Sequence, residues 1–180
     1  MPEPDNPREK IVLTDHDIYL FREGTHSRLY RHLGCHLAER DGTPGAEFAV
    51  WAPNARAVAV IGEWSHWKSD AHPLAARADS SGIWHGFVPA VQPGQTYKYR
   101  IESHHQGHVG EKAVPVAFCA ELPPATASRV WDLGYEWSDG EWMASRAQAN
   151  ALDAPMSIYE LHLGSWRRRP DGEWLGYRDA

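Results

Sequence analysis

The sequence of 180 residues has little of what several classes of protein require. It contains only two cysteines, Cys35 and Cys119, which excludes a disulfide framework and predicts reduced thiols in a cytoplasmic protein. No apolar run approaches the roughly 20 residues that a membrane span needs. The N-terminal stretch MPEPDNPREK lacks the apolar core of a signal peptide. These absences predict no membrane partner.

Positive charge is also scarce. The net charge is −6 with a pI near 6.0, and the only basic run is the triplet Arg167 to Arg169. A protein that binds nucleic acid as its main partner usually carries a basic face. The charge balance therefore argues against nucleic acid and against an anionic membrane surface as partners.

Motifs for catalysis and for cofactor binding are missing as well. The sequence has no G-x-S-x-G, no Walker A loop and no G-x-G-x-x-G. The cluster HHQGH, with His104, His105 and His108, follows a strand-like run, so we interpret it as a solvated turn and not as a set of metal ligands. The residues predict no catalytic group, no metal site and no cofactor.

What the sequence does have is aromatic residues and short β-type runs. Runs rich in Val, Ile, Tyr, Phe and Trp alternate with turns that contain Pro, Gly and Asn, which is typical of a small antiparallel sandwich. In TYKYRIES (96–103), Tyr97, Tyr99 and Ile101 should face one side, and Lys98 the other. The other predicted strands are 46–51, 58–62, 82–88, 116–122 and 128–133.

The pattern changes along the chain and predicts four segments. Residues 1–40 should hold a mobile tail, up to about residue 14, and short helical turns. Residues 41–133 should form a mainly β domain, and 134–155 a linker with a helix near 139–150. Residues 156–180 begin with MSIYELHLGSW, which is apolar on both faces and typical of a buried parallel strand at the start of a second domain.

The stretch GEWSHWKSD (62–70) places Trp64 and Trp67 three residues apart, where the chain should turn. We expect Trp64 to close one end of the sandwich and Trp67 to stay exposed. An exposed indole offers a flat surface for the apolar face of a sugar ring, and Lys98 could donate hydrogen bonds to the sugar hydroxyls. The spacing alone does not show that Lys98 and Trp67 are neighbours.

The blocks FAVWAPNARAVAVIGEWSHW and TYKYRIES, followed by MSIYELHLGSWRR, resemble the N-terminal region of bacterial 1,4-α-glucan (glycogen) branching enzymes. The resemblance covers about residues 15–180. It implies an immunoglobulin-like β-sandwich of the glycogen-binding type (carbohydrate-binding module family 48), then a linker and the first strand of a (β/α)8 barrel of glycoside hydrolase family 13. Enzymes of this family cut an α-1,4-glucan and transfer the segment to a 6-hydroxyl, forming an α-1,6 branch.

The resemblance assigns roles to three residues of the module. Trp67 matches the family's sugar-stacking tryptophan, Trp64 stands at a core aromatic position beside it, and Lys98 matches a lysine that helps to hold glucan. Ser65 and His66 depart from the family pattern at the turn, and because His takes a positive φ less readily than Gly, we expect a reshaped turn.

None of the motifs that carry the family's catalytic carboxylates occurs here, so we expect a truncated form of such an enzyme. The expected partners are α-1,4-glucan or glycogen and the enzyme's own barrel, and the family implies no cofactor. The alternatives are a stand-alone glycogen- or starch-binding module, a purely structural sandwich, or the N-terminal region of a related debranching or trehalose-releasing enzyme.

Overall fold

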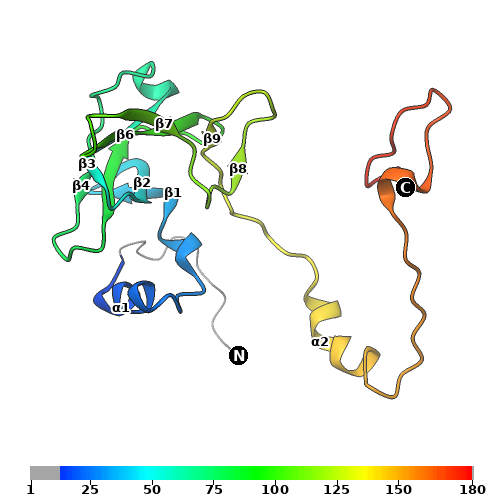
Figure 1. Cartoon of the computed structure of the whole chain (residues 1–180). Helices are drawn as coiled ribbons and strands as arrows, with labels where there is room; N and C mark the ends of the chain where they lie inside the picture. The colour runs from blue at the N-terminus through cyan, green and yellow to red at the C-terminus, as the bar shows by residue number, and fades with distance from the viewer. Residues whose placement is uncertain (1–12, 180) are drawn as a thin grey trace. The chain divides into compact units, whose positions relative to one another are not determined.

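The computed structural model describes residues 13–179, and its strands gather in the first part of the chain (Figure 1). The chain divides into two compact units, and the division along the sequence falls between Gly134 and Tyr135. The predicted tail falls largely on residues 1–12, outside the described part. Leu13, which the sequence places in that tail, is buried.

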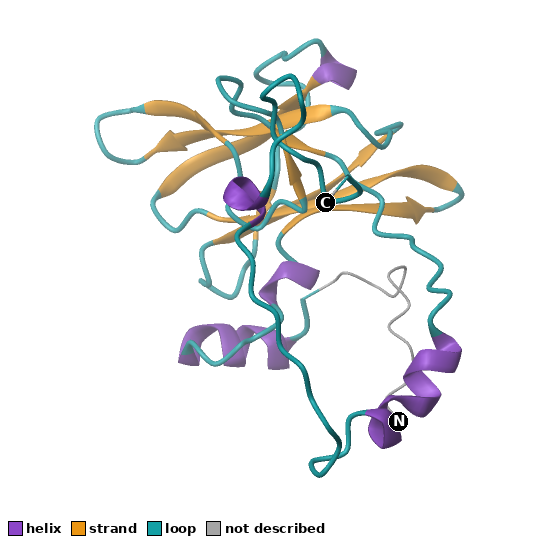
Figure 2. Ribbon diagram, turned by 90° about the vertical axis from the view of Figure 1, so that its right-hand side faces the viewer, coloured by secondary structure: helices purple, strands orange, loops and turns teal. Residues whose placement is uncertain are grey.

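The first unit is a sandwich of two antiparallel sheets, and Figure 2 shows them as stacked layers. This confirms the predicted mainly β, immunoglobulin-like architecture. One sheet has the order β1-β2-β5-β4, formed by β1 (Gly34–Arg40), β2 (Thr43–Trp51), β5 (Ile83–Pro89) and β4 (Ala75–Ala76). The other has the order β3-β6-β9-β8, with β7 also pairing β6, and consists of β3 (Ala55–Gly62), β6 (Thr96–Ser103), β9 (Ser128–Arg129), β8 (Cys119–Ala120) and β7 (Val109–Lys112).

The core lies between the sheets and follows the alternation of each strand. Tyr97 and Tyr99 of β6 are buried against Phe48 of β2, with ring centroids 5.2 Å and 6.4 Å from that of Phe48. The Tyr99 hydroxyl donates to the carbonyl oxygen of Gly34 at 2.8 Å, so this buried polar group is satisfied across the core. The predicted inward direction of both tyrosines is confirmed.

Helix α1 (Asp15–Glu23) packs on the outer face of the first sheet. Its N-terminus carries a capping box, in which the Thr14 side chain accepts from the Asp17 amide and the Asp17 carboxylate accepts from the Thr14 amide. Ile18 is its buried residue and contacts a cluster with Ala49 of β2 and Ile83 of β5. A 3₁₀ helix, η1 (Leu29–Arg31), links α1 to β1.

The sheet begins earlier than the predicted domain boundary at residue 41. Strand β1 opens at Gly34, within the segment predicted to hold helical turns, and it pairs along its length with β2. As the edge of its sheet, β1 needs only one apolar side, and its sequence GCHLAER carries a weak alternating pattern. The pairing with β2 decides its conformation, and that long-range contact is not visible in the local pattern.

The second unit contains α2 (Gly140–Ala149), where the sequence predicts a helix, and a short helix α3 (Leu163–Trp166). Residues 156–162 form no strand, which contradicts the predicted barrel strand. Ile158 is 82% exposed, although a buried strand would cover it. A parallel strand takes its backbone hydrogen bonds from strands beside it, and the elements of the second unit among its described residues are the helices α2 and α3. No described helix is long and apolar enough to span a membrane.

Candidate functional site

The turn after β3 places Trp67 on the surface. The 3₁₀ helix η2 (Glu63–Ser65) follows Gly62, and the Trp67 amide then donates to the Gly62 carbonyl at 3.0 Å. The Lys68 amide donates to the Ser65 carbonyl at 3.1 Å, so backbone hydrogen bonds fix the chain at Trp67 and at the residue after it. The Trp67 side chain is 40% exposed, and a fixed, partly exposed indole is suited to stacking.

Two adjacent residues of this turn are left-handed. His66 has a φ of 51° and Trp67 a φ of 59°. Residues other than glycine adopt this region at a cost of roughly 1–2 kcal/mol each, because Cβ approaches the carbonyl oxygen. His66 thus adopts the left-handed conformation despite its side chain. Strain of this kind is typical of functional positions.

Trp64 lies on the other side of the same turn, against the core. Its ring centroid is 5.6 Å from that of Phe48, and its indole lies directly over Gly62. The indole nitrogen is buried and has no hydrogen-bond partner in the described part of the chain. Trp64 therefore closes one end of the sandwich, as the sequence predicts for it. Trp64 thereby supports the turn that carries Trp67.

Lys98 lies on the face of β6 opposite the buried tyrosines. It pairs in register with Ile61, while Tyr97 pairs with Gly62, whose carbonyl holds the Trp67 amide. Lys98 and the start of the Trp67 turn at Gly62 therefore lie at the same end of the β3–β6 pair. No hydrogen bond or ring contact joins the two side chains within the described residues.

The Lys98 ammonium is held by a residue that the sequence does not single out. Its Nζ donates to the Thr126 hydroxyl at 2.9 Å. Thr126 precedes β9, 28 residues along the chain, and no spacing rule predicts that contact. An ammonium has three N–H groups, so one is used and two can reach water or a ligand.

Glu63 fastens the turn to the second sheet. Its carboxylate accepts from the backbone amide of Thr96, at the start of β6, at 2.9 Å. The turn and β6 are thereby joined by a side chain as well as by the strand pairing. The position of the indole relative to β6 is thus preorganised, which lowers the entropy lost on binding.

The histidines of the HHQGH cluster lie in the exposed turn between β6 and β7. A different group has the geometry of a metal site among the described residues: Asp17, His26 and His32. The Nδ1 atom of His26 accepts the Arg28 amide at 3.1 Å, so the proton sits on Nε2, which faces Asp17 at 3.1 Å. That proton makes the pair a hydrogen bond and leaves Nε2 without a lone pair for a metal.

The electrostatics of Asp17 follow from these contacts. Burial raises the pKa of its carboxyl, but hydrogen bonds from Thr14 and His26, with the charge of His32, outweigh burial and lower the pKa to about 2. The group belongs to the N-terminus of α1 and to a side of the first sheet that carries none of the predicted sugar-binding residues. We assign it a structural role.

Comparison with known proteins adds an independent observation. Residues 32–117 match the model of carbohydrate-binding module 48 (isoamylase N-terminal domain), and this range contains Trp64, Trp67 and Lys98. The 1,4-alpha-glucan branching enzyme GlgB of Albidiferax ferrireducens is 60% identical over 166 residues, which cover 92% of this chain and 26% of that protein. The enzyme of the same name from Aromatoleum aromaticum is 61% identical over 167 residues, 93% of this chain and 26% of that protein.

The chain is thus similar to 1,4-alpha-glucan branching enzymes over more than nine tenths of its own length. It spans about a quarter of the length of the curated relatives that it matches. Among solved structures, ligand-free PulA from Klebsiella pneumoniae is similar, with 28% identity, a TM-score of 0.44, and coverage of 56% of this chain and 9% of that one. The range that matches carbohydrate-binding module 48 lies wholly within the first unit.

Proposed function

We propose that the sandwich binds α-1,4-glucan, with one glucose ring stacked on Trp67 and hydroxyls bound by Lys98. The observation that carries the proposal is the exposed Trp67 indole on a turn fixed by the Gly62 carbonyl and by Glu63. Lys98 lies at the same end of the β3–β6 pair and keeps N–H groups free beyond its bond to Thr126. An aromatic platform beside a polar donor is the arrangement that sugar recognition needs.

The proposed role of this module is to recruit glucan for a branching enzyme. In that enzyme an α-1,4-glucan is cut and the segment is transferred to a 6-hydroxyl, with a retaining double displacement by two carboxylates. We assign no catalytic residue to the chain, and we propose that a (β/α)8 barrel of the same enzyme is its partner. The free thiols of Cys35 and Cys119 are compatible with a cytoplasmic location.

The test is the affinity of the chain for glycogen after Trp67→Ala. Loss of one stacked indole should weaken binding by about 1–3 kcal/mol, and Lys98→Ala should weaken it by a smaller amount. Trp137→Ala is the matched control, because Trp137 is an exposed tryptophan of the second unit. Pull-down with glycogen and titration with maltohexaose measure the effect.

Unchanged binding by the Trp67→Ala variant would support the purely structural reading of the sandwich. The circular dichroism spectrum should stay that of the parent chain, since Trp67 is not part of the buried core. A loss of affinity without a loss of fold is the expected result.

A further inference from the structure

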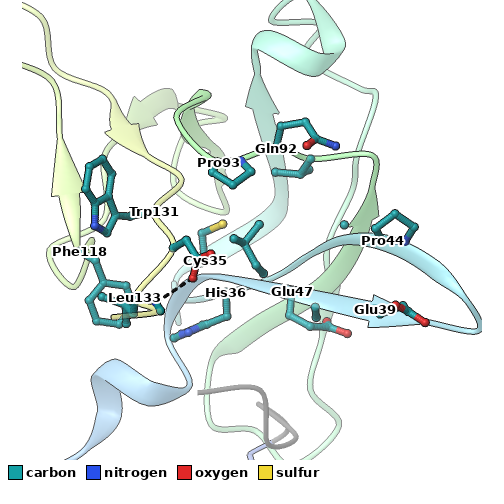
Figure 3. Close-up of a pocket in the computed structure, with 16 residues that line it drawn as sticks. Cys35, His36, Glu39, Pro44, Glu47, Gln92, Pro93, Phe118, Trp131 and Leu133 are labelled. Carbon is teal, nitrogen blue, oxygen red and sulfur yellow. Dashed lines mark hydrogen bonds between the residues drawn. The ribbon is translucent and has the colours of Figure 1, made fainter. Parts of the chain in front are cut away.

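A hollow lies beside β1, and we call it the β1 groove (Figure 3). Its volume is about 550 Å³, within the range of sites for small ligands. All of its residues belong to the first unit. They are residues 35–39 of β1, 44, 45 and 47 of β2, 91–93, 118 and 131–134.

One end of the β1 groove is aromatic and apolar. Trp131 and Leu133 lie there in Figure 3, and they are 49% and 46% exposed. The backbone before Trp131 is held on both sides, since the Val130 amide donates to the Gln95 carbonyl and its carbonyl accepts from Gly94, each at 2.8 Å. Trp131 is therefore a large exposed indole on a fixed backbone, as Trp67 is.

The rest of the β1 groove carries two carboxylates and one amide among apolar residues. Figure 3 shows Glu39 at the end away from Trp131, Glu47 on β2, and Gln92 along one side. No lysine or arginine is among the lining residues, but the Glu47 carboxylate is paired with the Arg40 guanidinium at 2.6 Å, so within the described residues Glu39 is the unpaired one of these two acids. In the part of the chain that the structure describes, the side chains of Glu39 and Gln92 make no hydrogen bond, and the Trp131 indole N–H makes none either.

This chemistry selects a neutral ligand rich in hydroxyl groups. Carboxylates accept hydrogen bonds from hydroxyls, and an amide can both donate and accept. The unpaired Glu39 carboxylate repels phosphates and acidic peptides. The aromatic end supplies the stacking surface for the apolar face of a ring.

We propose that the β1 groove is a second binding site for α-1,4-linked glucan, separate from the Trp67 turn. One ring stacks on Trp131, and the hydroxyls of rings farther along the β1 groove bind Gln92 and Glu39. The volume accommodates about two or three sugar rings. The identity of the sugar rests on the proposed function of the sandwich, whereas the site itself rests on the residues of the groove.

Two sites on one module would increase its affinity for a long polymer. Binding at the first site makes the second event intramolecular, and the overall affinity for a long glucan then exceeds that of either site. A short oligosaccharide occupies one site at a time and gains nothing. The affinity of the chain for glycogen should therefore depend on both tryptophans more strongly than its affinity for maltohexaose does.

The experiment follows the tryptophan indole ¹H–¹⁵N signals of the 180-residue chain during titration with maltohexaose. The signals of Trp67 and Trp131 are identified by their loss in Trp67→Phe and Trp131→Phe. We expect the Trp131 signal to shift in the parent chain and also in the Trp67→Ala variant. In that variant, adding Trp131→Ala should weaken the remaining binding about tenfold or more, and adding Trp137→Ala should not.

The outcomes separate the two proposals. A shift of Trp67 alone overturns the β1 groove as a sugar site and leaves the proposed function standing. A shift of Trp131 alone supports the groove and removes the Trp67 site, and a shift of neither overturns both. If the Trp131 shift disappears in Trp67→Ala, it was transmitted from the other site, and the proposal fails. A Trp131 signal that ignores maltohexaose but moves with pentalysine identifies a site for basic peptides and also overturns it.

Discussion

At the residue scale, the pair His66 and Trp67 shows how this chain holds an apolar side chain in water. Both residues are left-handed, and backbone hydrogen bonds to Gly62 and Glu63 keep them so. The neighbouring Trp64 supplies the apolar contact that anchors the turn to the core. The packing of the sandwich offsets the conformational cost of these two left-handed residues, and Trp67 keeps a defined orientation.

His66→Gly tests the strain in this turn. Glycine adopts a positive φ without steric cost, which should stabilise the folded chain by roughly 1–2 kcal/mol. Glycine also raises the entropy of the unfolded chain, which lowers stability by about 0.4–1 kcal/mol. We expect the free energy of unfolding to rise by about 0.5–1 kcal/mol, measured by urea denaturation. His104→Gly is the control, because His104 is exposed and does not have a positive φ, so that variant should lose stability. A loss in both variants would show that His66 is not strained.

The two cysteines should differ in reactivity. Burial raises the pKa of the Cys35 thiol far above its ordinary value, so it stays protonated at neutral pH and shielded from reagents. Cys119 is only half-buried, at the start of β8. An Ellman assay at pH 8 should titrate one thiol quickly in the native chain and the second only in denaturant. Two fast thiols in the native chain, or a slow Cys119 identified through Cys119→Ser, would contradict this.

At the scale of elements, α1 depends on Asp17 for its N-terminus. The carboxylate binds the Thr14 amide at 2.7 Å, and its other oxygen faces His26. The helix joins the sandwich through Ile18, so its capping is coupled to the outer face of the first sheet. Loss of a cap of this kind costs about 1 kcal/mol.

The stability contributed by Asp17 should depend on pH. Its pKa is about 2 in the folded chain and near 3.8 when unperturbed. Ionisation of Asp17 therefore stabilises the folded state relative to the unfolded state. The contribution is complete above the unperturbed value and is lost as the pH falls through 4 toward 2. Asp17→Asn should therefore lower the melting temperature at pH 6 and cost progressively less below pH 4. A difference that stays constant from pH 6 to pH 2 would contradict the assignment.

At the scale of the whole molecule, the second unit exposes apolar residues that a folded domain normally covers. Met156, Ile158 and Tyr159 are all exposed and lie close together in the sequence. Such a run favours association between chains. Because unit 1 holds the sandwich with its own core, removing the run should leave the fold of the sandwich intact.

Trimming the chain at about residue 150 should reduce aggregation. Light scattering at rising protein concentration would compare the 180-residue chain with residues 1–150. The 180-residue variant with Ile158→Lys and Tyr159→Lys is a control that disrupts the apolar run at unchanged length, and it should behave like the trimmed chain. Equal aggregation of all three proteins would show that residues 156–162 are not responsible.

The sequence by itself determined those features that depend on local patterns. Alternation in TYKYRIES placed Tyr97 and Tyr99 inward and Lys98 outward, and the polar residues around Trp64 and Trp67 marked a turn. The local rules of strand period and turn composition act over a few residues, so one chain is enough to apply them. The mainly β sandwich follows from several such runs in succession.

Only the tertiary structure decided the features that depend on distant residues. It paired β1 with β2, brought Thr126 to Lys98, and formed the β1 groove from segments between residues 35 and 134. It also left residues 156–162 without a strand, because strand pairing requires neighbours that an apolar pattern cannot supply. Contacts of this kind form only when the sheets close on their core, and this is why spacing along the chain does not reveal them.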